Sequence, residues 1–119
     1  MADINTEDSI LLSVKHMIGG LDEENTYFDI DLKIFINSTF MVLAQVGVGP
    51  DEPFKITGPE TLWSEFDCFD LESVKEYMYL KVKLTFDPPQ NGSVMQAYND
   101  RANELEWRLG IFSEELKDG

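Results

Sequence analysis

The stretch EYMYLKVKLTFDPP, residues 76–89, decides the fold because it fits two kinds of secondary structure. Every second residue from position 78 to position 86 is apolar, which is the period of a half-buried strand. Spacings of three and four residues also connect these apolar positions, as on one face of a helix. The fold class depends on which interpretation holds.

The surroundings of this stretch favour a helix. Asp70 stands where it can cap a helix, and Glu72 falls in the first turn, where negative charge is favourable. The pattern then continues unbroken to Asp87, which is too long for a typical strand of about 5–6 residues. No other segment offers a partner strand of matching length. We therefore expect a helix that ends at Pro88 and Pro89.

On a helix, the same alternation produces a very wide apolar face with Lys81 and Thr85 in its middle. A small core does not need so wide a face. Two interpretations remain open: the helix is crossed by two partners inside one bundle, or part of its face meets another subunit.

Length and composition are those of one globular domain. The chain has 119 residues, 43% of them hydrophobic, and no apolar run approaches the ~20 residues needed to span a bilayer. The first ten residues lack the basic and apolar regions of a secretion signal, and the lone Cys68 has no partner for an internal disulfide. We expect a soluble protein made in a reducing cytoplasm, with no membrane contact.

The chain is strongly acidic. It has 23 Asp and Glu residues against 9 Lys and Arg, for a formal net charge of -14. Such a charge argues against ordinary binding to nucleic-acid phosphates, so any contact with DNA should be repulsive or should imitate DNA.

Three further helices are predicted from apolar spacing. The first spans residues 10–21, with Thr6 or Ser9 as its N-cap and Gly19-Gly20 as its stop. The second spans residues 29–46 and is apolar around most of its circumference, so we expect it to be buried on more than one side. The last runs over residues 93–109, and Trp107 projects from the side opposite its apolar stripe.

Between the second and third helices, turn-forming residues predict a loop. Within it, residues 54–56 and 62–63 are candidates for a very short hairpin, and a helical turn is expected at residues 64–69. The predicted fold is thus mainly α: a small bundle of four main helices, with a short β-hairpin or loop insertion between the second and third. We assign residues 1–110 to a single helical domain and residues 111–119 to a C-terminal tail.

Candidates for catalysis or metal binding are poor. His16 falls on the polar face of the first helix with no second histidine, and the acidic neighbours of Cys68 would raise a thiol pKa. DEENTYFDID, residues 22–31, lacks the glycine and terminal glutamate of a calcium loop, and GVGPDEP, residues 47–53, lacks the lysine of a nucleotide loop. We expect no enzyme, cofactor or metal site.

Four phrases of the sequence point to a family. They are ILLSVKHMIG (10–19), FDIDLKIFINSTFMVLAQVGVGP (28–50), VKEYMYLKVKLTFDPP (74–89) and ELEWRLG (104–110). In order and spacing, over residues 10–110, the chain resembles the small head-tail connector (adaptor) proteins of tailed bacteriophages that infect Gram-positive bacteria. The family has no catalytic signature, and none is carried over.

The resemblance implies a structural protein of the virion neck. Its copies, typically twelve, form a ring under the portal protein, with a stopper or tail-completion protein below. Genomic DNA passes through the ring without specific binding during DNA ejection. The surplus apolar faces of the second and third helices would pack against ring neighbours, and acidic residues would line the channel.

Two sets of residues are expected to serve this virus assembly. An acidic region would line the channel or dock the next ring; its members are Asp51, Glu52, Glu60, Glu65, Asp67 and Asp70. Basic and aromatic residues would contact other subunits; they are Tyr77, Tyr79, Lys81, Lys83, Trp107 and Arg108. By family analogy, the tail over residues 111–119 would dock on the portal.

The runner-up is an acidic DNA-mimic protein that inhibits a host DNA-binding enzyme, because the net charge of -14 also suits that role. A mimic predicts a discrete monomer or dimer that competes with DNA. A connector predicts a ring that forms on the portal, so sizing by light scattering with and without portal-bearing heads separates the two.

Overall fold

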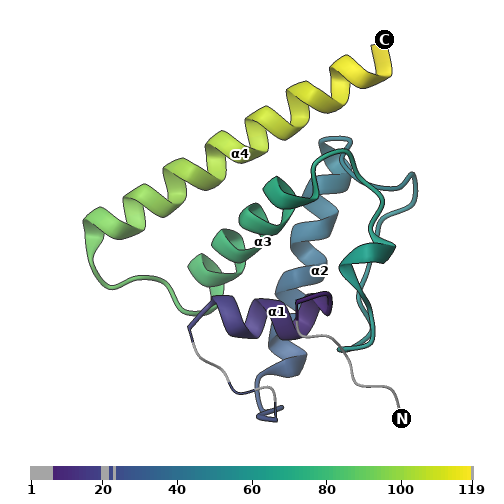
Figure 1. The fold of residues 1–119 in the computed structure, drawn as a ribbon. Coiled ribbons are helices and arrows are strands. Elements are labelled where there is room, and N and C mark those ends of the chain that lie inside the picture. Colours follow the sequence, from purple (N-terminus) through teal and green to yellow (C-terminus); the bar gives the residue numbers. More distant parts are fainter. Residues whose placement is uncertain (1–6, 20–21, 23, 119) are drawn as a thin grey trace.

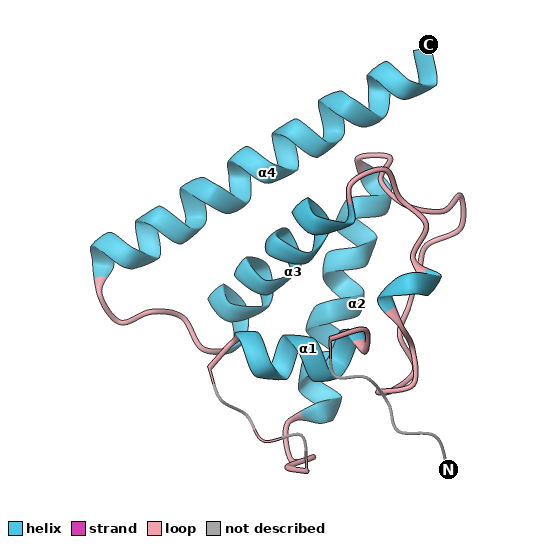
Figure 2. Cartoon of the chain, in the orientation of Figure 1, coloured by secondary structure: helices cyan, strands magenta, loops and turns pink. Residues whose placement is uncertain are grey.

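The computed structural model describes residues 7–19, 22 and 24–118. Four α-helices make up most of it: α1 (Ile10–Met17), α2 (Asp29–Gln45), α3 (Leu71–Phe86) and α4 (Gly92–Asp118), with a single 3₁₀ turn, η1 (Trp63–Glu65). Figure 2 draws no strand among the described residues, and the β pairing given for them is one isolated bridge between Ser9 and Leu62. The prediction of a mainly α fold with four main helices is confirmed.

The ambiguous stretch is helix α3, and its ends lie where the sequence placed them. The Asp70 side chain accepts hydrogen bonds from the backbone N–H and the hydroxyl of Ser73, which caps the first turn. At the other end the helix stops at Phe86, two residues before Pro88. Helical geometry therefore prevails over the two-residue alternation.

Contacts with other helices of the same chain explain the wide apolar face of α3. α3 packs against α1, α2 and α4, and Val74, Tyr77, Met78 and Val82 are fully buried in these contacts. Figure 1 shows α3 between α4 on one side and α1 and α2 on the other. Of the two open interpretations, the crossing of α3 by partners within the bundle accounts for most of its apolar face.

Helix α1 is shorter than predicted. Ser9 is its N-cap, with its hydroxyl accepting from the backbone N–H of Leu12. The helix ends at Met17 because Gly19 follows with φ +127°, a conformation that cannot continue a helix. The alternative N-cap Thr6 and the predicted end at residues 20–21 lie outside the described residues.

Helix α2 matches its prediction at both ends. Its first turn carries Asp29, whose carboxylate lies 2.9 Å from the ammonium of the fully buried Lys15 on α1. At its C-terminus the N–H groups of Gly47 and Val48 return to the carbonyls of Ala44 and Leu43, the pattern that commonly closes a helix at a glycine.

One side of α2 is buried and the other is open, contrary to the expectation that it would be buried on more than one side. Leu32, Ile36 and Leu43 face the core. Ile30 and Ile34 on the outer side keep 70% and 57% of their surface exposed. The reason is the flat shape of the molecule, 44 × 42 × 19 Å, which is about two helix diameters thick and leaves no further layer to cover α2.

The insertion between α2 and α3 is a loop without the suggested hairpin. The Asn37 side chain accepts a hydrogen bond from the Ile56 N–H and donates one to its carbonyl, so α2 takes the place of a partner strand. Trp63 belongs to η1, which begins one residue before the predicted turn. Its indole donates to the hydroxyl of Ser13 on α1, and the ring is fully buried.

Helix α4 is longer than predicted: it runs from Gly92 to Asp118 instead of ending near Leu109. Gly110 lies against Val46, and the buried hydroxyl of Ser113 donates a hydrogen bond to the Gly47 carbonyl at 2.6 Å. These contacts hold the C-terminal turns of α4 against the end of α2. Residues 111–118, predicted as a separate tail, continue the helix. Figure 1 shows α4 along one edge of the molecule, with its C-terminal end reaching past the other helices. Within the described residues, none of the helices is both long and apolar enough to span a bilayer.

Candidate docking surfaces

Tyr77, predicted at a subunit interface, is a core residue. Its side chain is fully buried, and its hydroxyl lies 2.5 Å from the Glu106 carboxylate on α4. Burial, and then the contact with Glu106, raises the pKa of the Tyr77 hydroxyl, so it stays a neutral donor. Tyr77 joins α3 to α4 and has no free surface for another subunit.

The other α3 candidates are used to different degrees inside the chain. Tyr79 is half-buried beside Ser13 and Trp63, and burial raises its pKa. The Lys83 ammonium donates to the Ile18 carbonyl at the end of α1 and to the Asp87 carboxylate. Lys81 is half-buried, and its ammonium makes no ion pair or hydrogen bond among the described residues. Lys81 is therefore the basic residue of α3 that is most available to a partner.

Trp107 and Arg108 lie on the solvent side of α4. The Trp107 indole keeps 67% of its surface exposed, as its position opposite the apolar stripe predicted. The Arg108 guanidinium is 3.5 Å from the Glu104 carboxylate one turn earlier, an exposed pair that constrains it only weakly. Both side chains are free to meet another protein.

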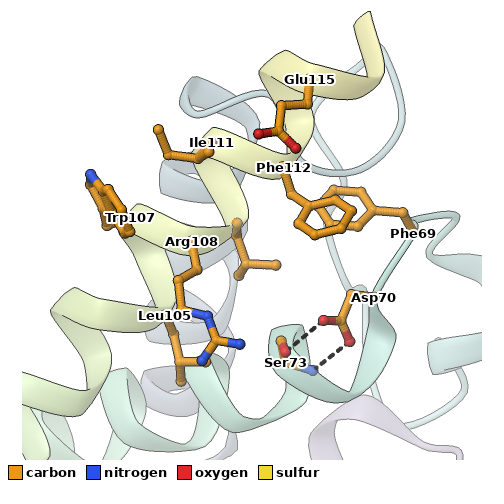
Figure 3. A pocket seen from close by; sticks show the side chains of 10 residues that line it. Phe69, Asp70, Ser73, Leu105, Trp107, Arg108, Ile111, Phe112 and Glu115 are labelled. Atoms are coloured by element: carbon orange, nitrogen blue, oxygen red, sulfur yellow. Dashed lines mark hydrogen bonds between the residues drawn. The ribbon is translucent and has the colours of Figure 1, made fainter. Parts of the chain in front are cut away.

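A hollow of about 230 Å³ lies between α4 and the start of α3 (Figure 3). Phe112 stacks on Phe69 at one end, with ring centroids 5.3 Å apart, and Trp107, Arg108 and Ile111 lie further along α4. Its volume is below the roughly 300–1,000 Å³ of small-molecule pockets. The hollow suits one or two apolar side chains of a docking protein.

All six residues of the predicted acidic region are exposed, but they do not form one uniform surface. Three of them organise the chain locally: Asp70 caps α3, Glu60 accepts from the Thr57 hydroxyl, and Glu65 accepts from the Leu62 N–H. The other three, Asp51, Glu52 and Asp67, make no ion pair or hydrogen bond among the described residues. These three are the carboxylates free to act on a partner or on passing DNA.

Two exposed apolar surfaces lie outside the predicted site residues, although the resemblance implied that a surplus apolar face of the second helix would meet a ring neighbour. One is the outer side of α2, with Ile30, Ile34 and Met41. The other is the start of α4, with Val94 and Met95. The signal was present in both cases, since α2 was seen to be apolar all round and both α4 residues belong to the predicted stripe. Spacing alone does not tell which part of a stripe the chain itself covers.

Comparison with family models decides what kind of protein carries these surfaces. The model described as phage connector protein matches residues 10–115, nearly the whole chain. The chain belongs to the phage connector protein family. Among curated proteins and among solved structures, none matches it significantly.

Two residues were considered as catalytic candidates in the sequence, His16 and Cys68. His16 is exposed on α1. Cys68 is half-buried, and burial raises the pKa of its thiol, with the Asp70 and Asp67 charges acting in the same direction. Among the described residues, no cluster of three or more His, Cys, Asp or Glu side chains is arranged to hold a metal. The exposed position of His16 and the raised pKa of Cys68 agree with what the sequence predicted for these two side chains.

Proposed function

We propose that this connector is a structural protein of the virion neck, an adaptor that joins the DNA-filled head to the tail in a phage of Gram-positive bacteria. Its copies, typically twelve, form a ring below the portal and above a stopper or tail-completion protein. The family match over residues 10–115 is the observation that supports the proposal most strongly. The exposed apolar side chains of α2 and α4 are consistent with it, because surfaces of this kind usually mark contacts with other proteins.

Deleting the gene from the phage tests the proposal. The expected result is DNA-filled heads and separate tails, with infectious tailed particles restored when the wild-type chain is supplied in trans. A control phage in which the gene carries only synonymous codon changes should behave as wild type. Normal yields of tailed, infectious particles from the deletion phage would contradict the role.

The unpaired carboxylates of Asp51, Glu52 and Asp67 are proposed to face the channel or the next ring. Negative charge in a channel repels DNA phosphates, so the genome slides without binding. Reversing the three to Lys should slow or block DNA ejection or the attachment of the next component. Reversing the exposed Asp22, Glu24 and Asp31 is the matched control. Unchanged retention and ejection of DNA in the first variant would show that these residues do not act in the channel.

Subunit contacts are proposed for the side chains that the fold leaves available, Lys81, Trp107 and Arg108. Truncating a Trp that becomes buried at an interface to alanine often costs about 2 kcal/mol or more of binding free energy. Trp107→Ala should therefore reduce assembly on portal-bearing heads, whereas Tyr27→Ala, which removes an aromatic ring that is 82% exposed, should not. Equal assembly of both variants would argue against the assignment.

Portal docking is proposed for the end of α4, residues 111–118, beside the hollow that Phe69 and Phe112 form. Leu116→Glu places a charge on an exposed apolar position there. The variant should fold normally and bind portal-bearing heads less tightly than wild type. Wild-type binding by Leu116→Glu would show that this end does not dock.

The alternative function, an acidic DNA-mimic protein, rests on the net charge of -14. A mimic would contact its target mainly through carboxylates, and this role does not by itself account for the exposed apolar side chains of α2 and α4. Light scattering with and without portal-bearing heads separates the two roles. A chain that leaves the heads unbound and displaces DNA from a nuclease or repressor would favour the mimic.

A further inference from the structure

The first two turns of α4 form an arm, residues 92–99, that the described part of the chain covers only in part: Val94 and Met95 keep 41% and 36% of their surface exposed. Residues 92–97 are all exposed, including Val94 and Met95. Because the spacing from these two residues to Ala102, Leu105 and Leu109 is helical, they lie on the side of α4 that is buried further along. The core-facing stripe of α4 thus continues into the arm, where its side chains are exposed among the described residues.

The outer side of α2 is a second uncovered apolar surface, the α2 ridge, formed by Ile30, Ile34 and Met41. Steps of four and seven residues align these side chains along the helix. All three are exposed, and Ile36 and Leu43, on the opposite side of α2, are fully buried. The ridge presents aliphatic side chains of a size that can pack against the Val and Met of the arm.

The arm and two of the three ridge residues, Ile34 and Met41, fall in the longest stretches of the chain without charge, whereas Ile30 lies between Asp29 and Asp31. Residues 34–50 and residues 88–99 contain no Asp, Glu, Lys, Arg or His, although charged residues are 27% of the sequence. Two copies that each carry a net charge of -14 repel each other across most of their surfaces. Contact between the uncharged arm and the largely uncharged ridge keeps the carboxylates apart. This electrostatic match favours a second copy of the chain as the partner.

We propose that the α4 arm of one copy packs on the α2 ridge of the next. The two surfaces lie on different helices, so each copy offers its arm to one neighbour and its ridge to another. Such a head-to-tail contact repeats and closes into a ring when the rotation between copies allows it. The inference rests on the ring proposed above and adds the surfaces that join its subunits.

Crosslinking tests the pairing directly. In a Cys68→Ser background, Ile34→Cys and Met95→Cys are placed in separate chains, and a short bismaleimide joins thiols that lie close together. An equimolar mixture of the two variants should give crosslinked dimers, and either variant alone should give few. A chain carrying both substitutions should give a ladder of multimers. A chain with Met17→Cys and Met95→Cys is the matched control, since Met17 is exposed on α1 outside the ridge.

The crosslinking is carried out on the concentrated purified chain and on phage particles. Dimers from one single-cysteine variant, without dimers from the mixture, would show a symmetric contact and overturn the proposal. If the chain is present in the neck but the double variant gives no ladder, the pairing is wrong and the connector function stands. If the chain is missing from the particles, the connector function fails, and crosslinking of the purified chain alone decides the pairing.

A substitution series gives an independent measure. Met95→Glu, on the exposed arm, should weaken association between copies at least about tenfold because it places a carboxylate against an apolar ridge. Met95→Leu keeps the apolar contact and should associate as wild type does. Equal association of the two variants would overturn the proposal.

Discussion

At the scale of single residues, Asn37 shows how the long insertion is held without a sheet. Its amide pairs with both backbone groups of Ile56, a residue that is itself buried. The sequence suggested a hairpin because residues 54–56 and 62–63 have strand-like composition. Nothing in the sequence indicated that a side chain from α2 would form the backbone hydrogen bonds of one of these segments.

Asn37→Ala should destabilise the protein by about 1–3 kcal/mol, because it leaves a buried N–H and a buried carbonyl of Ile56 unpaired. Urea unfolding followed by circular dichroism measures the change. Ser38→Ala, an exposed neighbour on the same helix, is the control and should stay within about 0.5 kcal/mol of wild type. An Asn37→Ala midpoint equal to that of the control would contradict this account of the loop.

The ion pair between Glu76 and Arg101 joins α3 to α4 and makes stability depend on pH. Two hydrogen bonds, of 2.7 and 3.0 Å, connect the groups, and the Arg101 guanidinium lowers the pKa of Glu76 from its ordinary value of 4.5. A lowered folded-state pKa gives stability that is present above pH 4.5 and is lost as the pH falls below it. Because the Glu76 and Arg101 side chains are 44% and 40% exposed, the contribution is at most about 1 kcal/mol.

Glu76→Gln should therefore be less stable than wild type at pH 7 by up to about 1 kcal/mol, and the difference should shrink as the pH falls below 4.5. Denaturant titrations at several pH values measure it. Glu52→Gln, which removes an exposed carboxylate without a partner among the described residues, is the control. A Glu76→Gln deficit that stays constant down to pH 3 would show that the charge pair is not its cause.

At the scale of elements, local sequence determined most helix boundaries and tertiary contacts determined the rest. Asp70 and the proline pair after α3 were identified correctly from the sequence, and Ser9 was one of two candidate N-caps of α1, because caps and breakers act on their own helix. The end of α4 was missed. The apolar pattern placed it near Leu109, but the contacts of Gly110 and Ser113 with the end of α2 stabilise the continuing helix. Those contacts join residues more than 60 positions apart.

The two glycines Gly110 and Gly49 should respond to alanine in opposite ways. An added Cβ at Gly110 would lie 3.6 Å from the Val46 Cβ, an ordinary contact, so Gly110→Ala should stabilise α4 by about 0.5–1 kcal/mol. At Gly49, with φ +103°, the Cβ would come within 2.7 Å of the Phe66 ring, so Gly49→Ala should cost about 1–2 kcal/mol or more. Thermal unfolding of both variants measures the difference. A Gly110→Ala variant less stable than wild type would mean that the end of α4 is not packed as described.

The candidate surfaces also show the limit of sequence patterns at this scale. The width of the apolar face of α3 was evident, yet its cover by α1, α2 and α4 was not, so Tyr77 was assigned to an interface although it is part of the core. The exposed position of Trp107, which needed only the phase of one helix, was predicted correctly. Contacts within one helix can be inferred from spacing, whereas contacts between helices depend on the packing of the whole chain.

At the scale of the whole molecule, acidity and uncovered apolar surface act in opposite directions. The charge of -14 keeps copies apart, and the α2 ridge and the α4 arm favour contact between them. A flat chain with both properties can remain separate in dilute solution and assemble where a partner concentrates it. This balance should respond to salt.

Raising the salt concentration should reduce repulsion between copies. The screening length falls from about 30 Å at 0.01 M to about 8 Å at 0.15 M, while apolar contacts are little affected. The second virial coefficient from light scattering should be positive at low salt and should decrease as salt is added. The charge-reversed Asp51, Glu52 and Asp67 variant, with less net charge, should start from a lower value. A coefficient that rises with salt would mean that ion pairs between copies dominate.

The most direct test of the connector role is electron cryomicroscopy of the neck of the phage particle that encodes this chain. We predict a ring of copies of this four-helix fold between the portal and the tail, in which neighbouring subunits cover the exposed sides of α2 and α4. A neck whose density is filled by other proteins, with no copy of this fold at the head–tail joint, would contradict it.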